Sequence, residues 1–192
     1  MGKSFVISVM SKDRPGIIAA VTTVVFDLGG DLADLNQSVL GGYFTMILIA
    51  EFDESVQKKD LLEKFSAVQK TTAMEALINE MEGDYPVNQR VLPRETYVLT
   101  AQAQNRKGLV KCLGDFFYSK NINVLDLVTT SDKDMYTMIF QVDLTEVHSM
   151  GELRNELKIL GKDQQLQLVL QHNDIYMATN EVGTALETII GV

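Results

Sequence analysis

The sequence has few of the residues that form cross-links, membrane spans or metal sites. Its 192 residues include one cysteine, Cys112, so no disulfide can form within the chain. No apolar run approaches the ~20 residues that a membrane-spanning helix needs. The two histidines, His148 and His172, stand apart from other ligands at metal-binding spacing. With a start that lacks a signal-peptide pattern, these absences predict a soluble cytoplasmic protein without a metal or other cofactor.

Positive charge is also scarce. The chain has 17 Lys and Arg against 26 Asp and Glu, a net charge of −9, and its basic residues form no cluster beyond pairs such as Lys58-Lys59. Direct binding to nucleic acid depends on clustered basic side chains that neutralise phosphates, so the composition disfavours it. Any role in gene control would therefore act through a protein partner.

What the chain does contain is an internal repeat. Gly16 and Gly108 are 92 residues apart, and the same shift aligns the sequence without a gap over a long stretch. Apolar positions coincide almost throughout, for example Phe5 with Tyr97, Val21 with Leu113, and Thr45-Met46-Ile47 with Thr137-Met138-Ile139. We therefore predict two copies of one unit, each of about 90 residues, a size at which a domain can fold alone.

Each copy contains a polar turn between a strand pattern and a helix pattern. In copy 1 the turn is Asp13-Arg14-Pro15-Gly16, and in copy 2 it is Asn105-Arg106-Lys107-Gly108. The helices that follow begin at Ile17 and Leu109. Such a turn leaves backbone N–H groups unpaired at the positive end of the helix dipole. A small anion, such as the carboxylate of an amino acid, can bind there.

The remaining periodicity predicts the same order of elements in both copies. For copy 1 it predicts a strand at 5–9, a helix at 16–28, strands at 32–39 and 43–52, and a helix from about 55. For copy 2 it predicts a strand at 97–101, a helix at 108–119, strands at 123–130 and 135–144, a helix at 149–160 ended by Gly161, and a strand at 165–170. The order β-α-β-β-α-β predicts an α+β protein of two ferredoxin-like units, each a four-stranded antiparallel sheet with two helices on one face. We expect the sister copy or a second chain to cover the other face.

Copy 1 is less regular after its second helix. The helical pattern continues through Met74, Leu77 and Ile78, and the segment 87–92 is the candidate for a last strand or a linker. Residues 173–192 carry an amphipathic helical pattern. The predicted domains are therefore 1–84 and 96–192, the second with a C-terminal helical extension. Residues 85–95 form the linker, which includes the last strand of domain 1 if 87–92 is one.

These features resemble the ACT domain family. The resemblance rests on the duplicated turn, the helix ended by Gly29-Gly30, Asp31 at the head of the next strand, and the β-α-β-β-α-β order. It covers nearly the whole chain as two tandem domains, an arrangement similar to the glycine cleavage system repressor family of stand-alone ACT regulators. The resemblance implies a regulatory protein that binds an amino acid where two domains pair, and no catalytic residue.

The resemblance also implies which residues contact the ligand. They lie in the turn and at the start of the second strand: Asp13, Arg14, Gly16, Ile17 and Asp31 in copy 1, and Asn105, Gly108, Leu109 and Asn123 in copy 2. Backbone N–H groups would hold the carboxylate, and side-chain oxygens would accept from the ammonium group. Copy 2 departs from the family pattern because Lys107 stands in the place of the usual proline.

Simpler interpretations stay open at this point. The two glycines can serve the turn alone, and Asp13 and Asn105 can cap their helices without a ligand. A second function is a protein-interaction regulator of amino-acid metabolism with degenerate ligand sites and a protein target. A remote third is an acylphosphatase-like enzyme that uses Arg14 and Asn36. The preferred partners are an amino acid and a paired domain, from the same chain or from a homodimer, with neither nucleic acid nor membrane.

Overall fold

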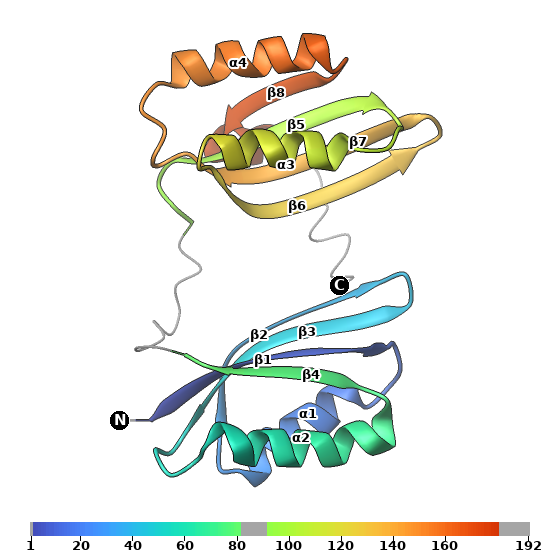
Figure 1. Cartoon of the computed structure of the whole chain (residues 1–192), viewed down its shortest axis with the longest axis vertical. Helices are drawn as coiled ribbons and strands as arrows, with labels where there is room; N and C mark the ends of the chain where they lie inside the picture. Colours follow the sequence, from blue (N-terminus) through green and yellow to red (C-terminus); the bar gives the residue numbers. More distant parts are fainter. Residues whose placement is uncertain (1, 82–91, 181–192) are drawn as a thin grey trace. The chain divides into compact units, whose positions relative to one another are not determined.

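A computed structural model describes residues 2–81 and 92–180 of the chain (Figure 1). The chain divides into two compact units, Met1–Arg90 and Val91–Val192, called unit 1 and unit 2 below. The predicted linker 85–95 falls largely on residues outside the described ranges, so the predicted domain boundaries stay a prediction. Within the described ranges, no helix has both the length and the apolar character needed to cross a membrane.

Unit 1 is a four-stranded antiparallel sheet with two helices. Its elements are β1 (Lys3–Lys12), α1 (Ile17–Asp27), β2 (Asp31–Leu40), β3 (Tyr43–Phe52), α2 (Lys58–Thr72) and β4 (Glu75–Glu80). The strands lie in the order β2-β3-β1-β4, so β1 and β3 are central and β2 and β4 are edges. The predicted order of elements is confirmed in this unit.

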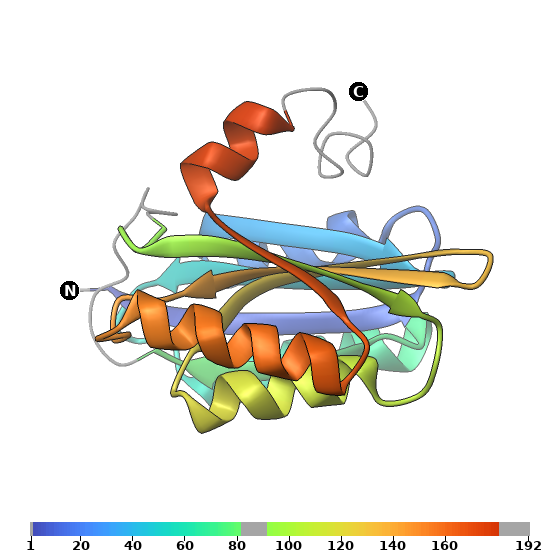
Figure 2. The same cartoon turned by 90° about the horizontal axis from the view of Figure 1, so that it is seen from above.

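Unit 2 repeats the plan and adds a short helix. Its elements are β5 (Thr96–Gln104), α3 (Leu109–Ser119), β6 (Asn123–Asp132), β7 (Met135–Asp143), α4 (Met150–Asp163), β8 (Gln167–His172) and α5 (Asn173–Thr179). The strand order is β6-β7-β5-β8, which is the order of the corresponding strands in unit 1. Figure 2 shows α3 and α4 on the same face of this sheet. The predicted α+β class with two ferredoxin-like units is confirmed.

Alternation along the strands builds each core. In β1, Phe5, Ile7 and Val9 are buried toward the helices, whereas the residues between them face the other side of the sheet. This is the period of two that a half-covered strand requires. The corresponding core of unit 2 includes Phe117 of α3, whose ring meets that of Phe140 edge to face with centroids 5.1 Å apart. Both cores therefore lie between the sheet and its two long helices.

The end of unit 1 differs from the prediction. The helical pattern was wrong beyond residue 72, because α2 ends at Ala73 in a left-handed conformation (φ 49°) and β4 follows at Glu75–Glu80. Met74 and Ile78 are both buried, and their spacing of four residues fits a helix and a strand equally well. The alternative strand at 87–92 falls almost wholly outside the described residues, and β4 occupies the place beside β1.

Two details of unit 2 also need correction. Gly161 does not end α4, which runs on to Asp163 with Gly161 buried inside it. A Cβ at Gly161 would lie 2.9 Å from the carbonyl oxygen of Leu166, so glycine is needed there for the close approach of α4 to the segment that enters β8. The amphipathic pattern at 173–192 corresponds to α5 as far as Thr179, and its residues 181–192 lie outside the described ranges.

The two sheets differ on the face away from the long helices, called the open face. In unit 1 this face carries exposed apolar side chains, including Ile47 and Leu77 at 50% and 73% exposure. In unit 2, α5 lies on this face (Figure 2), where Gln141 Nε2 donates to Asn173 Oδ1 at 2.9 Å. Val98, which pairs with Gln141 in the sheet, is buried. Coverage of the open face of unit 1 by another copy stays a prediction.

Leu61 and Leu62 offer a direct test of how α2 packs, since they are neighbours with 0% and 46% exposure. Leu61→Ala should lower the free energy of unfolding of unit 1 by about 2–5 kcal/mol, because it leaves a cavity in the core. Leu62→Ala should cost less than about 1 kcal/mol. Urea unfolding followed by circular dichroism measures both values, and equal losses would contradict the orientation of α2.

Candidate functional site

The two predicted binding turns have the same backbone geometry. Gly16 precedes α1 with φ 93°, and Gly108 precedes α3 with φ 91°. Such values favour glycine over any residue with a Cβ. A Cβ built at either position meets no atom within 4 Å, so it is the backbone conformation that selects glycine, and the space beside each turn is open.

Neither helix that follows these turns has a side-chain cap. The Gly16 carbonyl accepts from Ala20 N at 3.0 Å and the Gly108 carbonyl from Cys112 N at 2.9 Å, which starts each helix. Asp13 and Asn105 do not cap α1 and α3, and no acidic residue stands in either first turn. The alternative of simple capping is therefore wrong. The positive end of each helix dipole lies at the first N–H groups of the helix, and no carboxylate of the first turn balances it.

Each turn is tied to the tip of the neighbouring hairpin. Asp13 N donates to the Gly42 carbonyl at 3.0 Å, and Asn105 N donates to the Asp134 carbonyl at 2.6 Å. In unit 2, the guanidinium of Arg106 also donates to the carbonyl of Gln164, at the end of α4. The start of the first helix and the hairpin tip therefore lie at the same end of each sheet.

Asp31 and Asn123 lie at the opposite end. Asp31 pairs with Glu51 at the end of β3, whereas the turn adjoins the start of β3 at Tyr43. The distance along β3 between these ends is roughly 26 Å at the usual rise of a strand. Asn123 pairs with Asp143 in the same way in unit 2. Within one unit, the structure therefore does not bring Asp31 to Asp13, or Asn123 to Asn105, and one small amino acid cannot touch both.

The free side of β2 and the adjoining surface of α1 are unusually apolar. This surface, called the α1–β2 edge, consists of Ile18, Phe26, Leu32 and Val39, all exposed and on the helix side of the sheet. Phe26 and Val39 are 79% and 53% exposed. At one end of it, Phe26, Asp31 and Leu32 line a pocket of about 380 Å³. In unit 2, Val110 and Tyr118 occupy the positions of Ile18 and Phe26 and are exposed as well. Exposed apolar groups at matching places in both units mark a surface suited to pairing.

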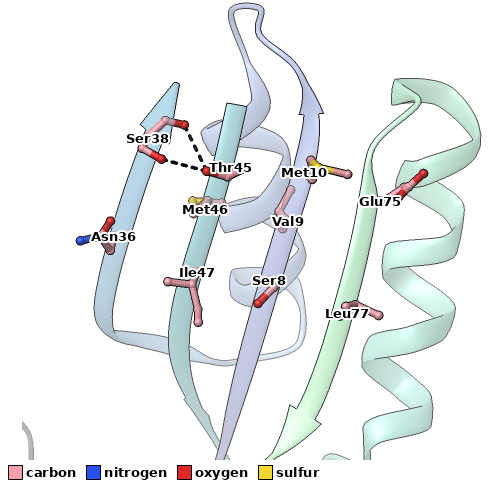
Figure 3. A pocket seen from close by; sticks show the side chains of 10 residues that line it. All are labelled: Ser8, Val9, Met10, Asn36, Ser38, Thr45, Met46, Ile47, Glu75 and Leu77. Atoms are coloured by element: carbon pink, nitrogen blue, oxygen red, sulfur yellow. Dashed lines mark hydrogen bonds between the residues drawn. The ribbon is translucent and has the colours of Figure 1, made fainter. Parts of the chain in front are cut away.

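A further pocket lies on the open face of unit 1 and was missed from the sequence. Its volume is about 360 Å³, and its lining includes Ser8, Asn36, Thr45, Ile47 and Leu77 (Figure 3). Alternation along β1, β2 and β3 places Ser8, Asn36, Thr45 and Ile47 outward, and that signal could have identified them. Leu77 lies on β4, which was not predicted. In unit 2, Val128 stands at the position of Asn36, so the polar group of this lining is not repeated there.

The placement of Asn36 bears on the enzyme alternative. Asn36 lies on the open face, in the middle of β2 opposite Ile47. Arg14 lies in the turn after β1, whereas Asn36 is in register with Ser8 across β3, so about 20 Å along the strand direction separates the two positions. The structure therefore does not bring together the arginine and asparagine that an acylphosphatase-like site would need.

The electrostatics of the turns add a difference between the units. In unit 2, a hydrogen bond from Lys111 to Asp115, and the charge of that carboxylate, raise the pKa of Lys111 in the first turn of α3. The ammonium charge near this turn is thereby stabilised. In the described part of the chain, no group of three His, Cys, Asp or Glu side chains could hold a metal ion.

Comparison with known proteins decides the family. The model of the ACT domain matches residues 3–77 of this chain. A UPF0237 protein of Methanopyrus kandleri is 33% identical over 86 residues, which are 44% of this chain and 96% of that protein. The chain belongs to the ACT domain family.

Solved structures extend the likeness to both units of this ACT protein. A protein assigned as a glycine cleavage system transcriptional repressor has a TM-score of 0.64 at 17% identity, over 89% of this chain and 97% of its own. A protein from Galdieria sulphuraria has a TM-score of 0.67 at 17% identity, over 90% and 99%. At these identities the likeness concerns the fold, and it confirms the predicted resemblance to tandem ACT proteins.

The absence of a cap can be checked within unit 2. Ser149 Oγ accepts from Glu152 N and caps α4, whereas Asn105 does not cap α3. Ser149→Ala should therefore cost about 1 kcal/mol of stability, and Asn105→Ala less than about 0.5 kcal/mol. Thermal and urea unfolding of both variants measure the difference. A loss at Asn105 as large as that at Ser149 would restore the capping role.

Proposed function

We propose that this ACT protein is a cytoplasmic regulator, not an enzyme, and that it senses an amino acid bound where two ACT domains pair. The observation that carries the proposal is the repeated helix start behind Gly16 and Gly108. In both units it combines a left-handed glycine, an open surface and no side-chain cap. These are the conditions under which helix N–H groups bind a carboxylate.

The ligand's ammonium group needs acceptors from two domains. Asp13 stands beside the turn, but Asp31 of the same unit lies at the far end of the sheet. If two β2 edges lie side by side and antiparallel, the Asp31 end of one meets the Leu40 end of the other, next to its turn. The exposed α1–β2 edge supplies the apolar surface that such pairing buries. The paired domains come from one chain or from a homodimer.

Unit 1 is the better candidate for the primary site. Asp13 and Asp31 are both carboxylates, which attract an ammonium group more strongly than the amides of Asn105 and Asn123 do. The turn of unit 2 carries Lys107 in place of Pro15, so its backbone is less restricted. Ile17 and Leu109 are the first residues of α1 and α3, and their side chains are buried in the two cores, so we assign them a ligand contact only through their backbone N–H groups. The contact of Arg14 rests on its place in the turn of unit 1.

A thermal-shift screen over the amino acids tests the proposal. A ligand at a hundredfold excess over its Kd stabilises the folded form by about 2.7 kcal/mol, which raises Tm measurably. Gly16→Ala should abolish the response, because its Cβ occupies the space where the carboxylate would approach.

Gly29→Ala is the matched control for this substitution. Gly29 also has a positive φ, 71°, and open space around its Cβ position, but it lies at the other end of α1. Both variants should lose about 1 kcal/mol of stability from backbone strain, so a ligand response that Gly29→Ala retains and Gly16→Ala loses is not a consequence of that strain. The proposal fails if no amino acid at millimolar concentration shifts the wild-type Tm.

The pairing surface has its own test. Phe26→Asp places a charge on the α1–β2 edge and should remove the ligand response while leaving the fold intact, since Phe26 is exposed. Leu62→Asp changes an exposed leucine on α2 of the same unit and should leave the response unchanged. Circular dichroism confirms that both variants are folded. A normal response in Phe26→Asp would exclude this edge as the place of pairing.

A second function, regulation through a protein target without an amino acid, is favoured by the exposed Ile47 and Leu77 on the open face of unit 1. It predicts a metabolic enzyme or transcription factor that binds the purified protein equally well with and without amino acids. Leu77→Asp should abolish that binding, whereas Phe26→Asp should not.

A further inference from the structure

Unit 2 contains a groove that no residue of the two turns lines. It lies between α4 and β8 and has a volume of about 360 Å³. Leucines form its floor, among them Leu157, Leu166 and Leu168. Its α4 wall carries Arg154, Lys158 and Lys162. An apolar floor beside a basic wall suits a ligand with apolar and acidic groups.

The basic residues form a row in a chain of net charge −9. They are spaced four residues apart on α4, and all three are exposed. Among the described residues, no acidic side chain forms an ion pair with any of them, and Arg154 Nη1 donates to the carbonyl of Leu170 at 3.4 Å. The row is particular to unit 2, because Leu62 and Ser66 stand 92 residues before Arg154 and Lys158.

The groove runs along the free edge of a sheet. β8 is an edge strand, and its residues from Gln167 to Gln171 include neither a charge nor a proline. The edge strand β4 of unit 1, by contrast, begins and ends with glutamate. Charges and prolines are the usual means by which proteins keep edge strands from pairing. The Leu170 carbonyl already accepts from Arg154 across the groove, so backbone groups of β8 face it.

Gly161 keeps the groove accessible. It lines the groove from α4, and a Cβ on it would lie 2.9 Å from the Leu166 carbonyl oxygen and 3.6 Å from the side chain of Leu168. Glycine therefore permits α4 to approach the start of β8 without a side chain between them. The position 92 residues earlier is Gln69, so this feature too is confined to unit 2.

We propose that this groove binds an acidic segment of a partner protein in an extended conformation, as an added strand beside β8. Four residues of α4 span about 6 Å, and two residues of a strand span about 6.7 Å. Acidic side chains at every second position of the segment therefore match Arg154, Lys158 and Lys162 in turn. Backbone pairing with β8 gives the affinity, and the charges select the partner. The inference does not rest on the amino-acid site.

The test uses the full chain and a fluorescein-labelled peptide with three Glu-Val repeats. Fluorescence anisotropy should report saturable binding that weakens as the salt concentration rises. The triple variant Arg154→Glu, Lys158→Glu, Lys162→Glu should bind at least about tenfold more weakly. The double variant Lys59→Glu, Lys64→Glu changes exposed lysines on α2 and should bind as the wild type does. Circular dichroism should show both variants folded.

Modified peptides separate strand pairing from attraction of charge alone. The first modified peptide is N-methylated at every glutamate, and the second is N-methylated at every valine. Each peptide therefore lacks the N–H groups on one side of the extended strand. One of the two should lose binding, while the other retains it. A peptide with Gln for Glu should bind at least about tenfold more weakly. Equal binding of all these peptides, or no binding of the Glu-Val peptide, would overturn the proposal.

Discussion

The register between β1 and β3 determines where everything else in unit 1 lies. Ten consecutive pairs, from Lys3 with Phe52 to Lys12 with Tyr43, run the whole length of both strands. Because β1 ends opposite the start of β3, the next residue, Asp13, donates to Gly42 at the hairpin tip. That bond fixes the point at which the chain turns into α1. The start of α1 therefore lies at one end of the sheet, and the start of β2, which follows α1, lies at the other.

In the proposed amino-acid site, this separation leaves one unit incomplete by itself. The helix start supplies N–H groups at one end, and Asp31 supplies a carboxylate at the other. Under the proposal, a second domain that lies antiparallel beside the first would complete one site at each end of the pair. A binding equilibrium of this kind ties ligand occupancy to domain pairing, since each stabilises the other. If the proposed pairing occurs within one chain, the duplication supplies both domains at high effective concentration.

Local sequence patterns predicted the fold well where the apolar residues fitted only one periodicity, either that of a helix or that of a strand. β3 was predicted at 43–52, its observed range, because Gly41-Gly42 marks its start and its alternation is unbroken. β4 was missed because Met74 and Ile78 fit two periods. The internal repeat contained the information that would have predicted β4, because the strand predicted at 165–170 corresponds to residues 73–78 of copy 1. The structure agrees with this correspondence, since Ala73 and Gln165 both have φ 49°. The separation of Asp31 from Asp13 and the groove beside β8 depend on register and packing, which local patterns do not contain.

Differences between the two copies separate the features that the shared fold requires from the features that occur in one unit only. The left-handed glycines and the alternating core recur in both units, as the shared architecture requires. The Asn36 pocket belongs to unit 1, and the basic row on α4 belongs to unit 2. In unit 2, Arg106 joins two of these surfaces, because it sits in the turn before α3 and donates to Gln164, two residues after Lys162. This hydrogen bond is a direct contact between the turn that recurs in both units and the end of the helix that forms one wall of the groove.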